Sequence, residues 1–258
     1  MERLAFMRAL LAACFLCTTF QSGWAQTVAS EADVLARSAR YGEPTDRYPH
    51  GILGRIAGWG TLDVVVSACA GCADERVRLR LPENRVFEDI KPRLWDVTGD
   101  GKPEVVVVES DQEKGARLVV LTAVVRDGRA SIEEIAATDF LGTRFRWLAP
   151  VAAADFDGDG RIEIAYVETP HRDKVLRLVR VIDGNLILVA SLSGVTAHRI
   201  GQEQIEGKLR LCAGVPELVL LSADYTRVIG LIFSRDAFKQ LDLGPARIAR
   251  LPRNAASC

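Results

Sequence analysis

Carboxylates concentrate in one short stretch of the chain, "ADFDGDGRIEIAYVE" (residues 154–168). Asp155, Asp157 and Asp159 alternate before a glycine, and Glu163 follows three residues after that glycine. Alternate acids on a tight turn can direct their oxygens toward one point, and glycine provides the backbone conformation that lets the chain wrap an ion. Without a cation, these acids would repel one another at short range. The stretch therefore predicts an oxygen-ligand site for Ca²⁺.

The residues after the glycine exclude half of an EF-hand. An EF-hand loop is closed by a bidentate glutamate at position 12, and a helix follows it. Counted from Asp155, position 12 is Tyr166. The continuation "RIEIAYVE" alternates and is rich in β-branched and aromatic residues, which predicts a strand. Glu163, at position 9, is then the closing carboxylate of a shorter loop.

A second copy of the pattern lies upstream, in "LWDVTGDGKPEVVVVES". Asp96, Thr98, Asp100 and Glu104 occupy positions 1, 3, 5 and 9, and a strand is again expected directly afterwards, over residues 105–108. The two closing glutamates are 59 residues apart, which indicates a repeat.

Two further copies have lost most of their acids. "GRIAGWGTLDVVVS" keeps two glycines and the carboxylate of Asp63, and "LRLCAGVPELVLLS" keeps Gly214 and the carboxylate of Glu217. Neither copy has acids at positions 1, 3 and 5, so neither is expected to bind an ion. The four closing carboxylates are 41, 59 and 54 residues apart, which predicts four repeats, two of them able to hold a metal.

"DVTGDGKPEVVVV" and "DFDGDGRIEIAYV" resemble the calcium loops of FG-GAP or VCBS-type repeats, found in integrin-α-like β-propellers and many exported bacterial proteins. The resemblance implies an all-β fold with one propeller blade per repeat. It also implies one or two Ca²⁺ ions, held by side chains at positions 1, 3, 5 and 9 and a backbone carbonyl at 7. The implied ligands are Asp96, Thr98, Asp100, the carbonyl of Lys102 and Glu104, and Asp155, Asp157, Asp159, the carbonyl of Arg161 and Glu163.

This sequence departs from the family pattern at Thr98, where an acid or amide is usual, so the first site is expected to be the weaker one.

About 230 residues remain after the N-terminal leader, and the observed repeat lengths allow four or five blades. We therefore predict a small β-propeller over residues 50–258. Residues 26–49 form a lead-in, in which Ser30 to Gly42 has the spacing and terminal glycine of a short helix.

The first 25 residues have the features of a cleaved secretory signal. Arg3 and Arg8 form a basic start, residues 9–20 are apolar, and small residues end at Ala25. A lipoprotein signal acylated at Cys14 is the less favoured alternative, because the apolar run continues past that cysteine. No other apolar run approaches the ~20 residues of a membrane helix. The protein is therefore expected in the periplasm or outside the cell.

Export changes the interpretation of the cysteines. Cys69, Cys72, Cys212 and Cys258 remain after cleavage, and an oxidising compartment favours two disulfides, with three possible pairings. We predict Cys69–Cys72 and Cys212–Cys258. A redox role for the first pair is disfavoured, because its flanks are strand-like rather than the start of a helix.

Other chemistry is less strongly indicated. The formal net charge of −1 argues against nucleic acid as a partner. No nucleophile elbow, phosphate loop or zinc-protease motif is present. His50, His171 and His198 lie far apart in loop-like contexts, and a propeller can bring distant loops together, so a shared site stays open. The tryptophans Trp59, Trp95 and Trp147 are predicted to lie in the blade cores.

These observations predict an exported calcium-binding β-propeller that acts as a binding or interaction module. Its calcium is structural rather than catalytic, its partner is an unknown protein or glycan, and no catalytic residue is assigned. One alternative is a propeller-fold hydrolase or lyase acting on glycans, which requires a polar central pocket with converging His, Asp, Glu or Arg side chains. Another is a structural subunit of an oligomer, which the solution mass would reveal.

Overall fold

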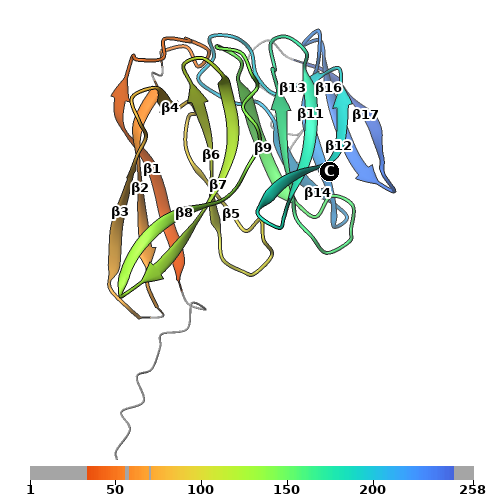
Figure 1. The fold of residues 1–258 in the computed structure, drawn as a ribbon. Helices are drawn as coiled ribbons and strands as arrows, with labels where there is room; N and C mark the ends of the chain where they lie inside the picture. The colour runs from red at the N-terminus through yellow and green to blue at the C-terminus, as the bar shows by residue number, and fades with distance from the viewer. Residues whose placement is uncertain (1–33, 56–57, 70, 247–258) are drawn as a thin grey trace, which may run out of the picture. The chain divides into compact units, whose positions relative to one another are not determined.

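The computed structural model describes residues 34–55, 58–69 and 71–246, and every regular element in this part of the chain is a β-strand (Figure 1). The strands are β1 (Leu35–Thr45), β2 (Gly58–Ser67), β3 (Asp74–Arg80), β4 (Arg85–Phe87), β5 (Arg93–Trp95), β6 (Glu104–Asp111), β7 (Gly115–Arg126), β8 (Arg129–Ala137), β9 (Leu148–Ala154), β10 (Glu163–Glu168), β11 (Val175–Ile182), β12 (Asn185–Ser193), β13 (Val195–Thr196), β14 (Lys208–Cys212), β15 (Val215–Ser222), β16 (Arg227–Ser234) and β17 (Ala237–Pro245). The all-β prediction is confirmed.

The strands form three antiparallel sheets that follow the chain. The first has the order β1-β2-β4-β6-β7-β8, with β3 added to β2 and β5 added to β6. The second has the order β12-β11-β10-β9, and the third contains β13 to β17. Within these sheets β5 to β8, β9 to β12 and β14 to β17 are four-stranded meanders, and β1 to β3 form a shorter one. This is a β-propeller-like arrangement of blade units.

The repeat pattern coincides with these units. The strands predicted after the four repeat loops are β2, β6, β10 and β15, the second strand of each unit. The two acid-rich loops join first and second strands, β5 to β6 and β9 to β10. Residues 105–108 of β6 are all valines and are completely buried. A continuous apolar run of this kind is expected in a strand that is covered on both faces. The predicted four repeats are therefore confirmed as strand units.

The expected helix over Ser30 to Gly42 is wrong from Leu35 onward, where the chain forms β1; residues up to 33 lie outside the described part. β1 pairs with β2 along its length, with a β-bulge between Ala36 and Ser38. The bulge inserts one extra residue and shifts the alternation. Successive apolar side chains that reach the core are then two or three residues apart, a spacing that resembles the period of a helix. They are Val34, Ala36, Ala39 and Tyr41.

Two hairpin turns are built on an Asp-Gly pair. Asp127 and Gly128 connect β7 to β8 with φ values of 51° and 73°, and Asp183 and Gly184 connect β11 to β12 with 48° and 76°. Positive φ at both central residues belongs to the type I′ turn, whose twist matches that of the flanking strands.

Of the three tryptophans assigned to blade cores, Trp147 is 2% exposed, whereas Trp59 and Trp95 are half-buried and pack against the two main apolar clusters.

Cys69 and Cys72 form a disulfide directly after β2, with their Cα atoms 5.1 Å apart, as predicted. The proposed partner of Cys212, Cys258, lies outside the described residues, and so do the predicted signal segment and Cys14. No helix within the described residues is long and apolar enough to cross a bilayer.

Candidate metal centres

Two acid-rich loops carry the predicted metal ligands. Loop 1 comprises residues 96–104 and joins β5 to β6, and loop 2 comprises residues 155–163 and joins β9 to β10. Each begins with an aspartate directly after a strand and ends with a glutamate that is the first residue of the next strand.

The first aspartate of each loop organises the turn by accepting backbone hydrogen bonds. Gly99 and Asp100 donate their N–H groups to Asp96 Oδ1 (2.7 and 3.2 Å), and Gly101 donates to Oδ2 (2.9 Å). In loop 2 the corresponding N–H groups donate to the two carboxylate oxygens of Asp155 at 2.7, 3.1 and 2.9 Å. The two loops therefore share one backbone scaffold.

Glycine is required at two positions of each loop. Gly99 and Gly101 have φ values of 77° and 86°, and Gly158 and Gly160 have 80° and 86°. An added Cβ would meet no other atom at these glycines, so the constraint is the left-handed backbone and not crowding. This conformation turns successive N–H groups inward toward the first aspartate.

The closing glutamates are buried. Glu104 and Glu163 are 3% and 0% exposed, and each accepts a backbone N–H from the second residue of its loop, Val97 or Phe156, at 2.9 Å. Burial raises the pKa of both carboxyl groups above the usual value for glutamate. Each glutamate therefore ties the loop to its strand, and a nearby cation would favour its ionised form.

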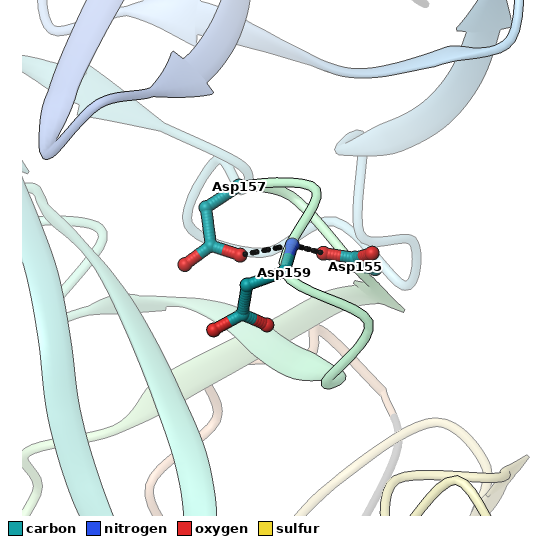
Figure 2. Close-up of side chains that lie close together, drawn as sticks. All are labelled: Asp155, Asp157 and Asp159. Atoms are coloured by element: carbon teal, nitrogen blue, oxygen red, sulfur yellow. Dashed lines mark hydrogen bonds between the residues drawn. The ribbon is translucent and has the colours of Figure 1, made fainter.

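Loop 2 gathers its acids around one point. Carboxylate oxygens of Asp155, Asp157 and Asp159 all lie within 4.8 Å of one another. Figure 2 shows the three side chains around the Asp159 amide, which donates to both Asp155 and Asp157. Carboxylate oxygens at this spacing fit Ca²⁺, which binds oxygen ligands in flexible geometry. Three of the predicted ligand side chains are thus brought together.

The predicted carbonyl donors, Lys102 and Arg161, occupy equivalent places. Each donates its backbone N–H at 2.9 Å to the preceding acid, Asp100 or Asp159. The Arg161 guanidinium also contacts Asp159 Oδ2 at 2.8 Å. This contact, with help from Arg180, lowers the pKa of Asp159 to about 2. Metal binding by the two carbonyls stays a prediction.

Arg180 on β11 was not predicted to take part. Its side chain is 7% exposed and reaches three acids of loop 2. Nε donates to Glu163 (2.7 Å), Nη1 to Asp159 (3.0 Å), and Nη2 to Asp157 (3.2 Å). In the sequence, the arginines of "KVLRLVRVIDG" suggest a solvated strand face. The strand register is needed to show that Arg180 lies at loop 2. Because Ile164 pairs with Val179, Arg180 lies beside Glu163.

Loop 1 has a neutral residue at the equivalent place. Val105 pairs with Leu121, so Thr122 lies beside Glu104. Loop 2 thus has one more acid than loop 1, Asp157 in place of Thr98, and one more cation, Arg180 in place of Thr122. Loop 1 has three carboxylates and Lys102, and loop 2 has four carboxylates with Arg161 and Arg180, so both sites have a formal charge of −2.

The two degenerate copies hold an ion pair instead of an acidic loop. Arg78 on β3 contacts Asp63 at 2.6 Å, and Arg210 on β14 contacts Glu217 at 2.8 Å. Both carboxylates are buried. An arginine from an adjacent strand therefore compensates the closing carboxylate in three of the four repeats.

A family model described as an FG-GAP-like repeat matches residues 96–166, which span both loops and the strands between them. No curated protein matches the chain. The repeat spacing, the strand units and this match agree, so residues 96–166 form an FG-GAP-like repeat region within an all-β fold.

Proposed function

We propose that this protein is an exported interaction module whose β-propeller-like fold is stabilised by calcium in loops 1 and 2. The observation that carries the calcium proposal is the convergence of three aspartate carboxylates on a backbone scaffold that loop 1 repeats. Export rests on the basic, apolar and small-residue pattern of residues 1–25.

The residues present fit a calcium ion. Asp155, Asp157 and Asp159 would hold it in loop 2, and Asp96, Thr98 and Asp100 would hold it in loop 1, with carbonyl and glutamate oxygens completing each shell. All of these donors are hard oxygen ligands, the type that Ca²⁺ prefers. When bound, the ion neutralises the converging carboxylates and holds the first and second strands of a blade together. This role is structural.

An interaction role suits the fold, because FG-GAP repeats place many connecting segments at the ends of the blades. The partner is a protein or a glycan whose identity the chain does not specify. Loops that depend on calcium would keep such a surface ordered outside the cell, where calcium is available at millimolar concentration.

Melting curves in calcium and in chelator test the proposal. Extracellular calcium sites with a Kd of ~10⁻⁴ M add about 1.4 kcal/mol each in millimolar calcium. For a domain of this size, that raises Tm by roughly 3–6 °C per site. The Asp96→Ala/Asp155→Ala double variant should lose the calcium-dependent rise. An unchanged Tm of the wild-type protein in calcium would contradict the proposal.

A further inference from the structure

A cavity of about 190 Å³ lies where connections from all three sheets meet, away from both acidic loops. The segments that form it are the β1–β2, β8–β9 and β10–β11 connections and the segment that follows β13. Its lining combines aromatic and apolar side chains with two histidines and two arginines. The lining residues that the argument uses are His50, Phe145, Arg146, Trp147, His171 and Arg172.

His50 is held in one orientation by a buried carboxylate. Its Nδ1 lies 2.6 Å from Glu88 Oε1, and Glu88 is 5% exposed. The other oxygen of Glu88 accepts a hydrogen bond from the Ser110 hydroxyl. The contact with Glu88 engages Nδ1 of His50 and fixes the orientation of its ring.

His171 is fixed by a second chain of hydrogen bonds. His198 donates from Nε2 to the Gln202 carbonyl (2.8 Å), so its Nδ1 accepts a hydrogen bond from His171 Nε2 (2.9 Å). The Nδ1 atom of His171 is then an acceptor. Burial, together with the neighbouring histidines, lowers the pKa of His171 to about 4, so this ring is neutral at physiological pH.

Aromatic rings border the cavity as two stacked pairs. The His50 and Phe145 rings are 5.0 Å apart, and the Trp147 and His171 rings are 6.4 Å apart and nearly parallel, at 8°. Trp147 is held in place because its indole N–H donates to the Glu88 carbonyl (2.7 Å). Such ring faces favour a flat apolar ligand.

Two arginines, Arg146 and Arg172, line the cavity and bring positive charge to it. Among the described residues, neither Arg146 nor Arg172 forms a side-chain hydrogen bond or ion pair, whereas Arg177 and Arg180, on the strand that follows Arg172, are both paired with carboxylates. None of the described residues that line the cavity is an aspartate or glutamate. An anion, and not the two-carboxylate chemistry of glycan cleavage, is therefore the complement of this lining.

We propose that this cavity binds a small aromatic carboxylate. The ring lies beside the stacked side chains, the carboxylate meets Arg146 and Arg172, and His50 and His171 contribute the faces of their rings and make no hydrogen bond to the carboxylate. A cavity of about 150 Å³ accepts benzene, so a volume of 190 Å³ suits a single ring with one substituent. This site is separate from the calcium loops, and its ligand does not depend on them.

Histidine NMR gives a direct test, because the only three histidines of the sequence are His50, His171 and His198. Benzoate is titrated into the calcium-loaded protein with ¹⁵N-labelled histidine, and nitrobenzene, which has the same shape but neither a charge nor a hydrogen-bond donor, serves as the neutral control. Benzoate should shift the His50 and His171 ring signals saturably, and nitrobenzene should bind at least about tenfold more weakly, since a hydrogen bond to a charged group is the stronger one.

The Arg146→Gln/Arg172→Gln variant should bind benzoate at least about tenfold more weakly and nitrobenzene unchanged. Its melting temperature and histidine spectrum establish that the fold is intact. Equal affinity for benzoate and nitrobenzene in the wild-type protein would overturn the proposal. So would the absence of any histidine shift at roughly 10 mM benzoate, or shifts caused by inorganic phosphate but not by benzoate.

Discussion

Loop 1 and loop 2 share one backbone scaffold, and their charged side chains differ at one pair of positions. Asp157 and Arg180 in loop 2 correspond to Thr98 and Thr122 in loop 1, so the added acid comes with an added cation. The ligand positions of a loop therefore do not by themselves determine the net charge of the site. A residue on the adjacent strand, outside the motif, contributes to that charge as much as a ligand position does.

This difference alters the expected ranking of the two sites. Judged from the motif alone, loop 1 is the weaker site because of Thr98. Arg180, however, already forms hydrogen bonds with Asp157, Asp159 and Glu163, and an ion in loop 2 must compete with it. No arginine contacts the acids of loop 1 among the described residues. We therefore propose that loop 1 depends more on calcium, whereas loop 2 carries part of its charge compensation within the chain.

Removing the arginine should have the largest effect. The Arg180→Met variant leaves Glu163 buried and unpaired, which costs about 3–5 kcal/mol in chelator. The Tm should fall by roughly 6–20 °C, and calcium should restore part of it by replacing the guanidinium. The matched control is Arg161→Met, which removes an exposed arginine beside the same loop and should change Tm little. A similar loss in both variants, or no recovery in calcium, would contradict the role given to Arg180.

Adding the arginine to loop 1 is the reciprocal change. In the Asp155→Ala background, Thr122→Arg places a guanidinium beside Glu104. A unit charge about 4 Å from a divalent ion in a watery environment costs about 2 kcal/mol, so calcium affinity should fall roughly 30-fold. Calorimetry measures the affinity, and Thr122→Gln controls for side-chain size. If the Arg and Gln variants bind calcium alike, charge from the adjacent strand is not what distinguishes the loops.

Restoring the missing acid of loop 1 should have a smaller effect in the opposite direction. Thr98→Asp, again with loop 2 disabled, should raise calcium affinity roughly tenfold, because part of the added attraction is lost to repulsion among the acids. Thr98→Asn supplies an oxygen without the charge and should give a smaller gain. An unchanged affinity in the Thr98→Asp variant would show that this position is not a ligand.

The smallest expected effect is on a pKa in the calcium-free protein. Asp159 should titrate at about 2, mainly because of Arg161 and secondarily because of Arg180. Since folding lowers this pKa from 3.8, the ionised carboxylate contributes stability above pH 3.8 that is lost as the pH falls toward 2. Carboxyl NMR should show Arg161→Gln raising the pKa more than Arg180→Gln. A larger rise of the Asp159 pKa in the Arg180→Gln variant would mean that Arg180, and not Arg161, is the main cause of the low pKa.

Much of this molecule could be predicted from local patterns. The acids, the glycines and the strands that follow them are determined by residues close in sequence, and the structure confirms the strands after both loops. β1 was missed because a bulge between Ala36 and Ser38 disguises the alternation of its core side chains. A period of two becomes visible only when the bulge position is known.

The features that sequence reasoning missed depend on contacts between distant segments. Arg180 joins loop 2 only through the register of β10 with β11, which one sequence does not specify. His50 pairs with Glu88, 38 residues away, and His171 with His198, 27 residues away. These side chains meet because connections from different sheets converge, so topology had to be known before the cluster could be seen.

The most direct test of the account is a calorimetric calcium titration of two single-loop proteins. Asp155→Ala retains loop 1, and Asp96→Ala retains loop 2 with its arginine. We expect both proteins to bind one calcium ion and the loop 1 protein to bind it more tightly. Adding Arg180→Gln to the loop 2 protein should raise its affinity for calcium. Tighter binding by unmodified loop 2, or no heat of binding in either protein, would contradict this expectation.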